Sequence, residues 1–216
     1  QTKEGRLSNV TTILTNNVGS FVSPNFREEL GNWWLKHRTG RANTPNWDLV
    51  VSCQIAGQPG LILVEAKANK NEMHTSGKPI KGNASENSKA NHEQIAKAII
   101  NARQGFKGSG WPLELSRDCC YQLSNRLAFT WKLATLGIPV VLIYLGFLED
   151  EGISDAGRPF ASHQDWLDYF AECSCDVLID GFCEEEVLLG GIPVWLLLRS
   201  RRAIESSPPA QARTHL

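Results

Sequence analysis

The sequence predicts an α/β protein in which helices cover both faces of a mixed central sheet, a three-layer α/β/α sandwich. Segments with helical and strand periodicity follow one another as helix, hairpin, helices and strand, the order typical of layered α/β folds. The strand expected at 140–147 is apolar throughout, as in strands that lie beneath helices. Together these two observations predict the layers.

The chain of 216 residues is long enough to bury a sizeable core. We expect a single domain over 1–202, with its core at about 23–147 and a C-terminal extension at 148–202, followed by a disordered tail at 203–216. Hydrophobic residues at 42% and charged residues at 21% are ordinary for a soluble protein. The apolar runs are much shorter than the ~20 residues of a membrane span, so no membrane association is expected.

The first half of the chain predicts a helix and a β-hairpin. Ser23 suits the helix N-cap and Pro24 the first helical position. Gly57-Gln58-Pro59-Gly60 is a strong turn signal between two strand-like runs. We therefore expect a helix at about 23–37 and strands at about 48–56 and 61–68.

The second half predicts further helices and two apolar strands. Residues 69–87 form a polar loop, and a loop of this length in a compact domain is usually functional or mobile. Gly137 suits a helix C-cap, and Pro139 prevents continuation. We expect helices at about 88–104, 116–136 and 164–173, a glycine-rich break at 105–110, and strands at 140–147 and 192–199.

The net charge of −1 conceals an uneven distribution of charge. Residues 68–107 carry seven Lys and Arg against three Glu, whereas residues 148–191 carry twelve Asp and Glu against one Arg. The near-neutral total argues against coating nucleic acid by bulk charge, but a locally basic segment is compatible with a nucleic-acid groove. Charge alone equally allows two solvated surfaces.

The six cysteines suggest no secreted disulfide framework, which favours a reducing, cytoplasmic setting. A zinc site is the alternative, but the available residues lack the paired C-x₂₋₄-C knuckles of common structural sites. Its candidate ligands are His163, Cys173, Cys175 and Cys183.

Three polar residues on the expected hairpin indicate chemistry. Glu65 and Lys67 are two apart on one strand and so share a face. A hairpin loop with an even number of residues places Asp48 on that same face, whereas an odd loop or a bulge removes it. Two-residue turns at 57–58 or 59–60 satisfy the even loop.

The trio admits two interpretations. A surface ion pair between Glu65 and Lys67 is the simpler one, because such triplets are common by chance. However, Glu65 continues the apolar run 61–64, where charged groups are seldom unpaired. Two carboxylates converging there would repel unless a cation lay between them, and Mg²⁺ prefers such hard oxygen ligands. The apolar strand, the acid at Asp48 and the basic loop that follows together favour a metal site.

A resemblance to the PD-(D/E)XK nuclease superfamily, which has the restriction-endonuclease-like fold, extends over roughly 23–147. It rests on Thr44-Pro45-Asn46-Trp47-Asp48-Leu49 and Ile62-Leu63-Val64-Glu65-Ala66-Lys67-Ala68. The resemblance implies that Asp48 and Glu65 bind Mg²⁺, which Mn²⁺ can replace, with help from the carbonyl of Ala66. It also implies that Lys67 assists the attacking water. The sequence departs from the pattern in having Trp47 rather than Pro before the acid.

Other positions are weaker candidates for the site. Members of the superfamily often add an acid from the first helix and a Gln from the helix after the E-x-K strand, which would be Glu29 and Gln94 here. Each also fits a structural role, as a solvated flank or a backbone bridge. Lys78, Lys81 and Asn91 are candidates for binding nucleic acid, and Arg126 could pair with a phosphate or with an acid.

The sequence therefore predicts a metal-dependent nuclease, a hydrolase acting on DNA in restriction, defence or repair, with RNA also open as substrate. A catalytically inactive module that binds nucleic acid or protein on the same fold is the alternative. Many members act as homodimers, and nothing here identifies an interface. Loops typical of nucleotide, dinucleotide or serine-hydrolase sites are absent from the sequence.

Overall fold

The computed structural model describes residues 18–38, 43–150 and 157–202. Their elements follow the chain as η1 (Val18–Ser20), α1 (Pro24–Trp34), β1 (Leu49–Ile55), β2 (Gln58–Lys67), η2 (Lys70–Glu72), α2 (Glu86–Gly108), α3 (Tyr121–Thr135), β3 (Val140–Leu148), α4 (His163–Ser174), β4 (Val187–Leu189) and β5 (Ile192–Arg202). The expected tail at 203–216 lies outside the described residues.

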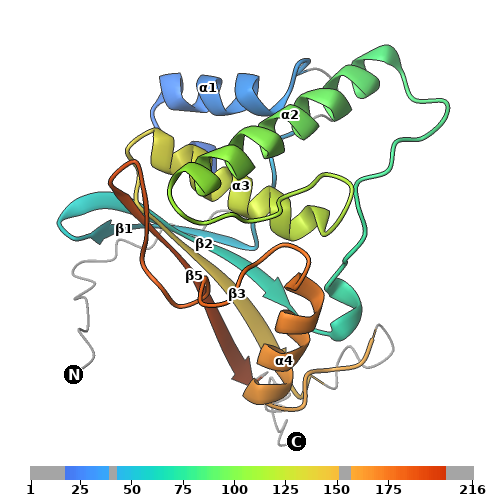
Figure 1. Ribbon diagram of the computed structural model, residues 1–216, viewed down its shortest axis with the longest axis vertical. Coiled ribbons are helices and arrows are strands. Elements are labelled where there is room, and N and C mark those ends of the chain that lie inside the picture. The colour runs from blue at the N-terminus through green and yellow to red at the C-terminus, as the bar shows by residue number, and fades with distance from the viewer. Residues whose placement is uncertain (1–17, 39–42, 151–156, 203–216) are drawn as a thin grey trace, which may run out of the picture.

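A five-stranded mixed sheet in the order β1-β2-β3-β5-β4 is the centre of the molecule. The inner strands β2, β3 and β5 are parallel, and β1 and β4 pair antiparallel at the two edges. The carboxyl ends of the three parallel strands therefore meet at one end of the sheet, beside α4 (Figure 1). The expected α/β class is confirmed.

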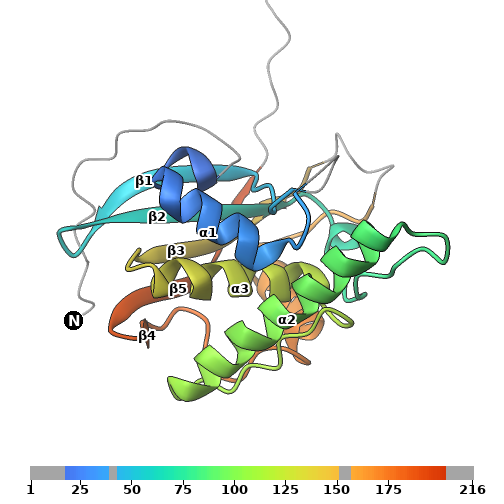
Figure 2. The same cartoon turned by 90° about the horizontal axis from the view of Figure 1, so that it is seen from above.

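All four described helices pack on one face of the sheet (Figures 1 and 2). Arg126 of α3 contacts Glu65, and Phe170 of α4 contacts Tyr144, which is the neighbour of Glu65 on the same face. Trp33 and Trp34 of α1 pack on Phe129 of α3. The described residues thus form two layers, with no second helical layer on the opposite face, which differs from the expected three-layer sandwich.

The hairpin has the expected parity but a different turn. Ile55 pairs with Gln58, so the two-residue loop is Ala56-Gly57, with φ of 50° and 80°. These positive values are those of a type I′ turn, which matches the twist of the flanking strands. Pro59 and Gly60 belong to β2 rather than to the turn. Alanine is not a typical turn residue, so the sequence did not indicate that the turn begins at Ala56, and the predicted turn was displaced along the chain.

The helices differ from expectation at their ends because of tertiary contacts. α2 continues through the expected glycine-rich break, where Gly105 packs so closely on Trp131 of α3 that a Cβ would overlap its ring. α3 begins at Tyr121 rather than near 116, because the backbone of 117–121 pairs with that of 75–78. α1 ends at Trp34, three residues before the predicted end at His37.

The C-terminal part agrees with the sequence patterns apart from the end of β5, which runs to Arg202 rather than to 199, and one additional strand. β3 extends one residue beyond its predicted end, and Ser162 accepts the Asp165 N–H as the cap of α4. The short strand β4 was not predicted, although Gly190-Gly191, both at positive φ, is a hairpin signal. None of the described helices combines the length and apolar composition that crossing a bilayer requires.

Candidate active site

The hairpin brings Asp48 next to the strand that carries Glu65. The ladder ends with Leu49 opposite Val64, and the Asp48 N–H donates to the carbonyl of the same Val64 at 3.2 Å. Both acids lie where β2 approaches its carboxyl end. The Asp48 side chain is exposed, whereas Glu65 is 3% exposed beneath α3.

Glu65 is bound by three cationic or amide side chains. Lys67 Nζ and Gln122 Nε2 donate to its Oε1 at 2.7 and 2.8 Å. Arg126 approaches Oε2 with Nε at 2.7 Å and Nη2 at 2.6 Å. Because a carboxylate has about four lone-pair sites, these donors saturate it.

Arg126 also connects Glu65 to the segment before Asp48. Its Nη2 donates to the Asn46 carbonyl at 2.9 Å, and its guanidinium lies 4.6 Å above the Trp47 ring. A planar guanidinium is suited to stacking and forked hydrogen bonding at once. Trp47 thus forms the platform for Arg126.

Asp48 is held by the backbone of β2. Its Oδ2 accepts the Ala66 N–H at 2.7 Å. This bond fixes the carboxylate at the edge of the site, while the side chain remains exposed to an incoming ion or substrate. The structure therefore brings Asp48 to the backbone of Ala66, which stands between Glu65 and Lys67 on β2, and pairs those two side chains with each other.

Tyr144 borders the same cluster. Its hydroxyl is buried without a hydrogen-bond partner among the described residues. Burial, and then the charge of Glu65, raise the pKa of Tyr144 well above its ordinary value. It therefore stays a neutral phenol beside the carboxylate and adds no charge to the site.

No group of three or more His, Cys, Asp or Glu in the described part of the chain is arranged to hold a metal ion. This applies to the zinc candidates as well: His163 Nδ1 lies 2.9 Å from Ser200 Oγ, and Cys173, Cys175 and Cys183 are free thiols. For Mg²⁺, Asp48 and Glu65 supply two carboxylates. That number is sufficient, because protein Mg²⁺ sites often use one or two carboxylates together with water and phosphate.

A cavity of about 440 Å³ adjoins the site. Arg126 and Gln122 form one wall, and the segment containing His74 and Lys78 forms another. Desolvation lowers the pKa of Lys78, whose ammonium lies 4.8 Å over the Tyr121 ring. The residues lining this cavity include no Asp or Glu among those the structure describes, so its charge is positive.

Three other predicted residues have structural contacts. Gln94 donates to the Trp33 carbonyl at 2.8 Å, which ties α2 to α1. Asn91 both accepts from and donates to the backbone of His37, at 2.7 and 2.8 Å. Glu29 is half exposed and pairs with Lys132 of α3 at 2.6 Å. None of these contacts involves the carboxylates of the hairpin.

Gln122 is a site residue that sequence reasoning missed. It stands four residues before Arg126 on α3, so the two share a helix face. That spacing was available as a signal, but it does not reveal which face of α3 meets β2. Lys81 lines a second hollow beside the cavity.

The chain matches no protein-family model, no curated protein and no solved structure.

Proposed function

We propose that the chain is a metal-dependent nuclease that hydrolyses phosphodiester bonds, with DNA as the favoured substrate. The observation that supports this proposal is the pair of Glu65 and Lys67 on either side of Ala66, whose N–H binds Asp48, next to a positively charged cavity. Carboxylates on one side suit a divalent ion, and cations on the other suit phosphates. Buried charge clusters at a cavity are also characteristic of functional sites.

Mg²⁺ fits the donor set under one condition. Asp48 uses its Oδ2 for the Ala66 N–H and can offer its other oxygen to the ion. Glu65 can join only by releasing one of the donors that Lys67, Gln122 and Arg126 supply. When bound, the ion would polarise a phosphoryl oxygen and lower the pKa of a coordinated water.

The side chains of the chain itself supply the remaining functions. Lys67, released from Glu65, is placed to hold the attacking water and to stabilise developing negative charge. Arg126 lines the cavity and engages Glu65 and Asn46 through Nε and Nη2, so Nη1 would bind a phosphate oxygen there. Both groups are buried, where such electrostatic effects are stronger than in water.

A module that binds nucleic acid without cutting it is the second candidate. The hydrogen bonds of Lys67, Gln122 and Arg126 to Glu65 favour it, because they neutralise and fully hydrogen-bond this carboxylate without a metal ion. On this alternative the cluster stabilises the fold, and the cavity retains its affinity for anions.

Cleavage of labelled single- and double-stranded DNA in Mg²⁺, Mn²⁺ or EDTA separates the two candidates. Lys67→Met keeps the side-chain volume and removes the charge, and Lys107→Met, at an exposed position on α2, is the matched control. We expect metal-dependent cutting by the wild type and the control and none by Lys67→Met. A folded wild type that binds divalent ions to no measurable extent and cuts neither DNA nor RNA would reject the nuclease.

A further inference from the structure

The cavity beside the carboxylates continues into a second hollow of about 750 Å³ along the start of α2. The two share Asn43, Lys78 and Ile95, so Lys78 stands at their junction. The charged groups among the described lining residues of both hollows are Lys78, Lys81 and Arg126, with no carboxylate. In a chain with 23 acidic residues, such a lining indicates a groove for an anionic ligand.

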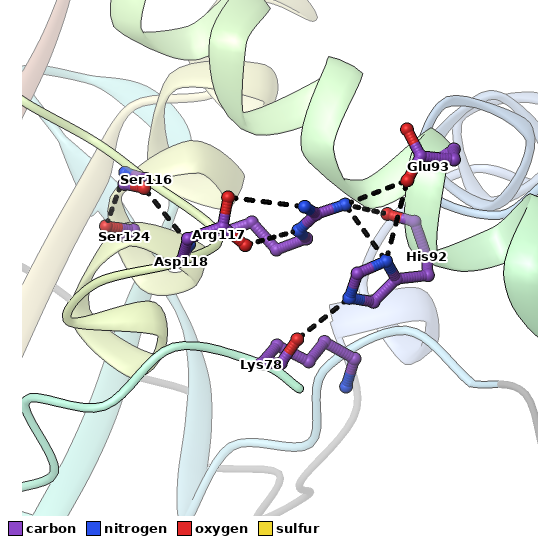
Figure 3. Close-up of polar contacts among 7 residues, drawn as sticks. All are labelled: Lys78, His92, Glu93, Ser116, Arg117, Asp118 and Ser124. Atoms are coloured by element: carbon purple, nitrogen blue, oxygen red, sulfur yellow. Dashed lines mark hydrogen bonds and ion pairs between the residues drawn. The ribbon is translucent and has the colours of Figure 1, made fainter. Parts of the chain in front are cut away.

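The backbone at Lys78 is fixed by His92, as Figure 3 shows, and by Arg117. Its N–H donates to the Arg117 carbonyl at 2.8 Å, and its carbonyl lies 2.8 Å from His92 Nε2. Arg117 Nη1 lies 2.9 Å from His92 Nδ1, and because arginine only donates, His92 accepts there and donates through Nε2. At Gly77 any Cβ would overlap the backbone of Asp118, so this close approach requires glycine. Lys78 is therefore held in place before any ligand arrives.

The Lys78 ammonium takes no part in this network (Figure 3). Its contact is with the ring of Tyr121, and no carboxylate of the described residues pairs with it. Desolvation of this half-buried group lowers the pKa of Lys78, so the charge lacks compensation. A phosphate at the junction of the hollows would supply it.

The inner cavity has a further unused group. Asn125 is 6% exposed and lines the cavity, and its Oδ1 is buried without a donor among the described residues. Its side chain lies within hydrogen-bonding reach of the Tyr121 hydroxyl. The edge of a nucleobase carries N–H donors that complement such an acceptor, as when an unpaired base enters a protein pocket.

We propose that the inner cavity receives one unpaired nucleotide of the substrate, with a neighbouring phosphate on Lys78 and the strand continuing along the outer hollow past Lys81. A cavity of about 440 Å³ is in the size range of single small-ligand sites, and a continuous duplex cannot enter it. The inference rests on the proposed nuclease and names its substrate class: a single-stranded segment or end.

The test is binding without cleavage. Fluorescence anisotropy in EDTA would compare a short labelled single-stranded DNA with the same strand annealed as a blunt duplex. Lys78→Met removes the charge at the junction, and Lys107→Met removes an exposed charge at the far end of α2. We expect the wild type to prefer the single strand, and Lys78→Met to weaken that binding several-fold. The slope of log K against log salt should become shallower by about 0.7, the value for one phosphate contact on a single strand. Lys107→Met should retain the wild-type affinity and slope.

Equal affinity for single strand and duplex, or identical behaviour of the two lysine variants, would overturn the inference. These outcomes differ from a failure of the nuclease. If the protein binds single strands through Lys78 but shows no metal-dependent cutting, the nuclease proposal is rejected and the single-strand groove is supported. If Lys78→Met still cuts, and uses blunt duplex and single strand equally, the nuclease proposal is supported and the single-strand groove is rejected.

Discussion

Arg126 and Glu65 form a buried ion pair in which two nitrogens of the guanidinium meet one carboxylate oxygen, at 2.7 and 2.6 Å. The pair joins α3 to β2, and through the Asn46 carbonyl it also holds the segment that leads to Asp48. The position of Asp48 is thus coupled to Arg126, the cation that binds Glu65. Buried pairs of this kind contribute little net stability but are costly to break.

Replacing Arg126 with Met should destabilise the protein by about 3 kcal/mol, because it removes one partner of a buried pair. Lys67 remains to neutralise Glu65, which keeps the loss at the lower end of the range for such changes. Urea unfolding, with the denaturant dependence compared between variants, measures the effect. Arg126→Lys should recover only part of the loss, because lysine lacks the fork that reaches Glu65 and Asn46 together. A loss below about 1 kcal/mol would show that the pair is not buried as described.

Replacing Asp48 with Asn should separate metal binding from stability. The amide oxygen can still accept the Ala66 N–H, so the unfolding free energy should change by less than about 1 kcal/mol. Metal affinity, measured by titration calorimetry with Mn²⁺, should fall by more than about tenfold. Replacing residues that only hydrogen-bond to metal ligands already lowers metal affinity by about 10–100-fold. Asp180→Asn, at an exposed position outside the site, is the control. Equal Mn²⁺ affinity in both variants would remove Asp48 from the metal site.

Some features that depend on local pattern were predicted from the sequence. The even parity of the hairpin loop followed from the turn signals, and it is confirmed although the turn lies at Ala56-Gly57. β3 was predicted almost to the residue, because a bounded apolar run after a helix cap has few interpretations.

Features set by long-range contacts could not be predicted. Gln122 and Arg126 lie 57 and 61 residues from Glu65 in the chain, and helix periodicity does not specify how α3 is rotated over the sheet. The late start of α3 likewise depends on pairing between 117–121 and 75–78. The number of layers depends on where the connections place each helix, which local pattern does not encode.

Replacing Gln94 with Leu should affect stability and not the site. Its amide donates to the Trp33 carbonyl, so the variant should lose about 1 kcal/mol of unfolding free energy. Cleavage and Mn²⁺ affinity should match the wild type. Loss of either one in a folded Gln94→Leu protein would show that the residue takes part in the site, as the nuclease resemblance implies.

The pair between Asp165 and Lys70 predicts a pH dependence of stability. The two meet at 2.6 Å where η2 contacts the start of α4, and Asp165 also accepts the Ala161 N–H. The Lys70 bond first, and then the backbone bond, lower the pKa of Asp165 below its ordinary value of 3.8. Because the folded state favours the ionised carboxylate, this contribution to stability is complete above the unfolded pKa and is lost as the pH falls through the folded pKa.

Asp165→Asn should therefore be less stable than the wild type at neutral pH, and the difference should shrink as the pH falls below 3.8. Urea unfolding of both proteins across that range measures the difference directly. Asp168→Asn, at an exposed position on the same helix, controls for the general loss of one negative charge. A difference between Asp165→Asn and wild type that stays constant down to the acid limit would show that hydrogen bonding, and not the charge on Asp165, stabilises this junction.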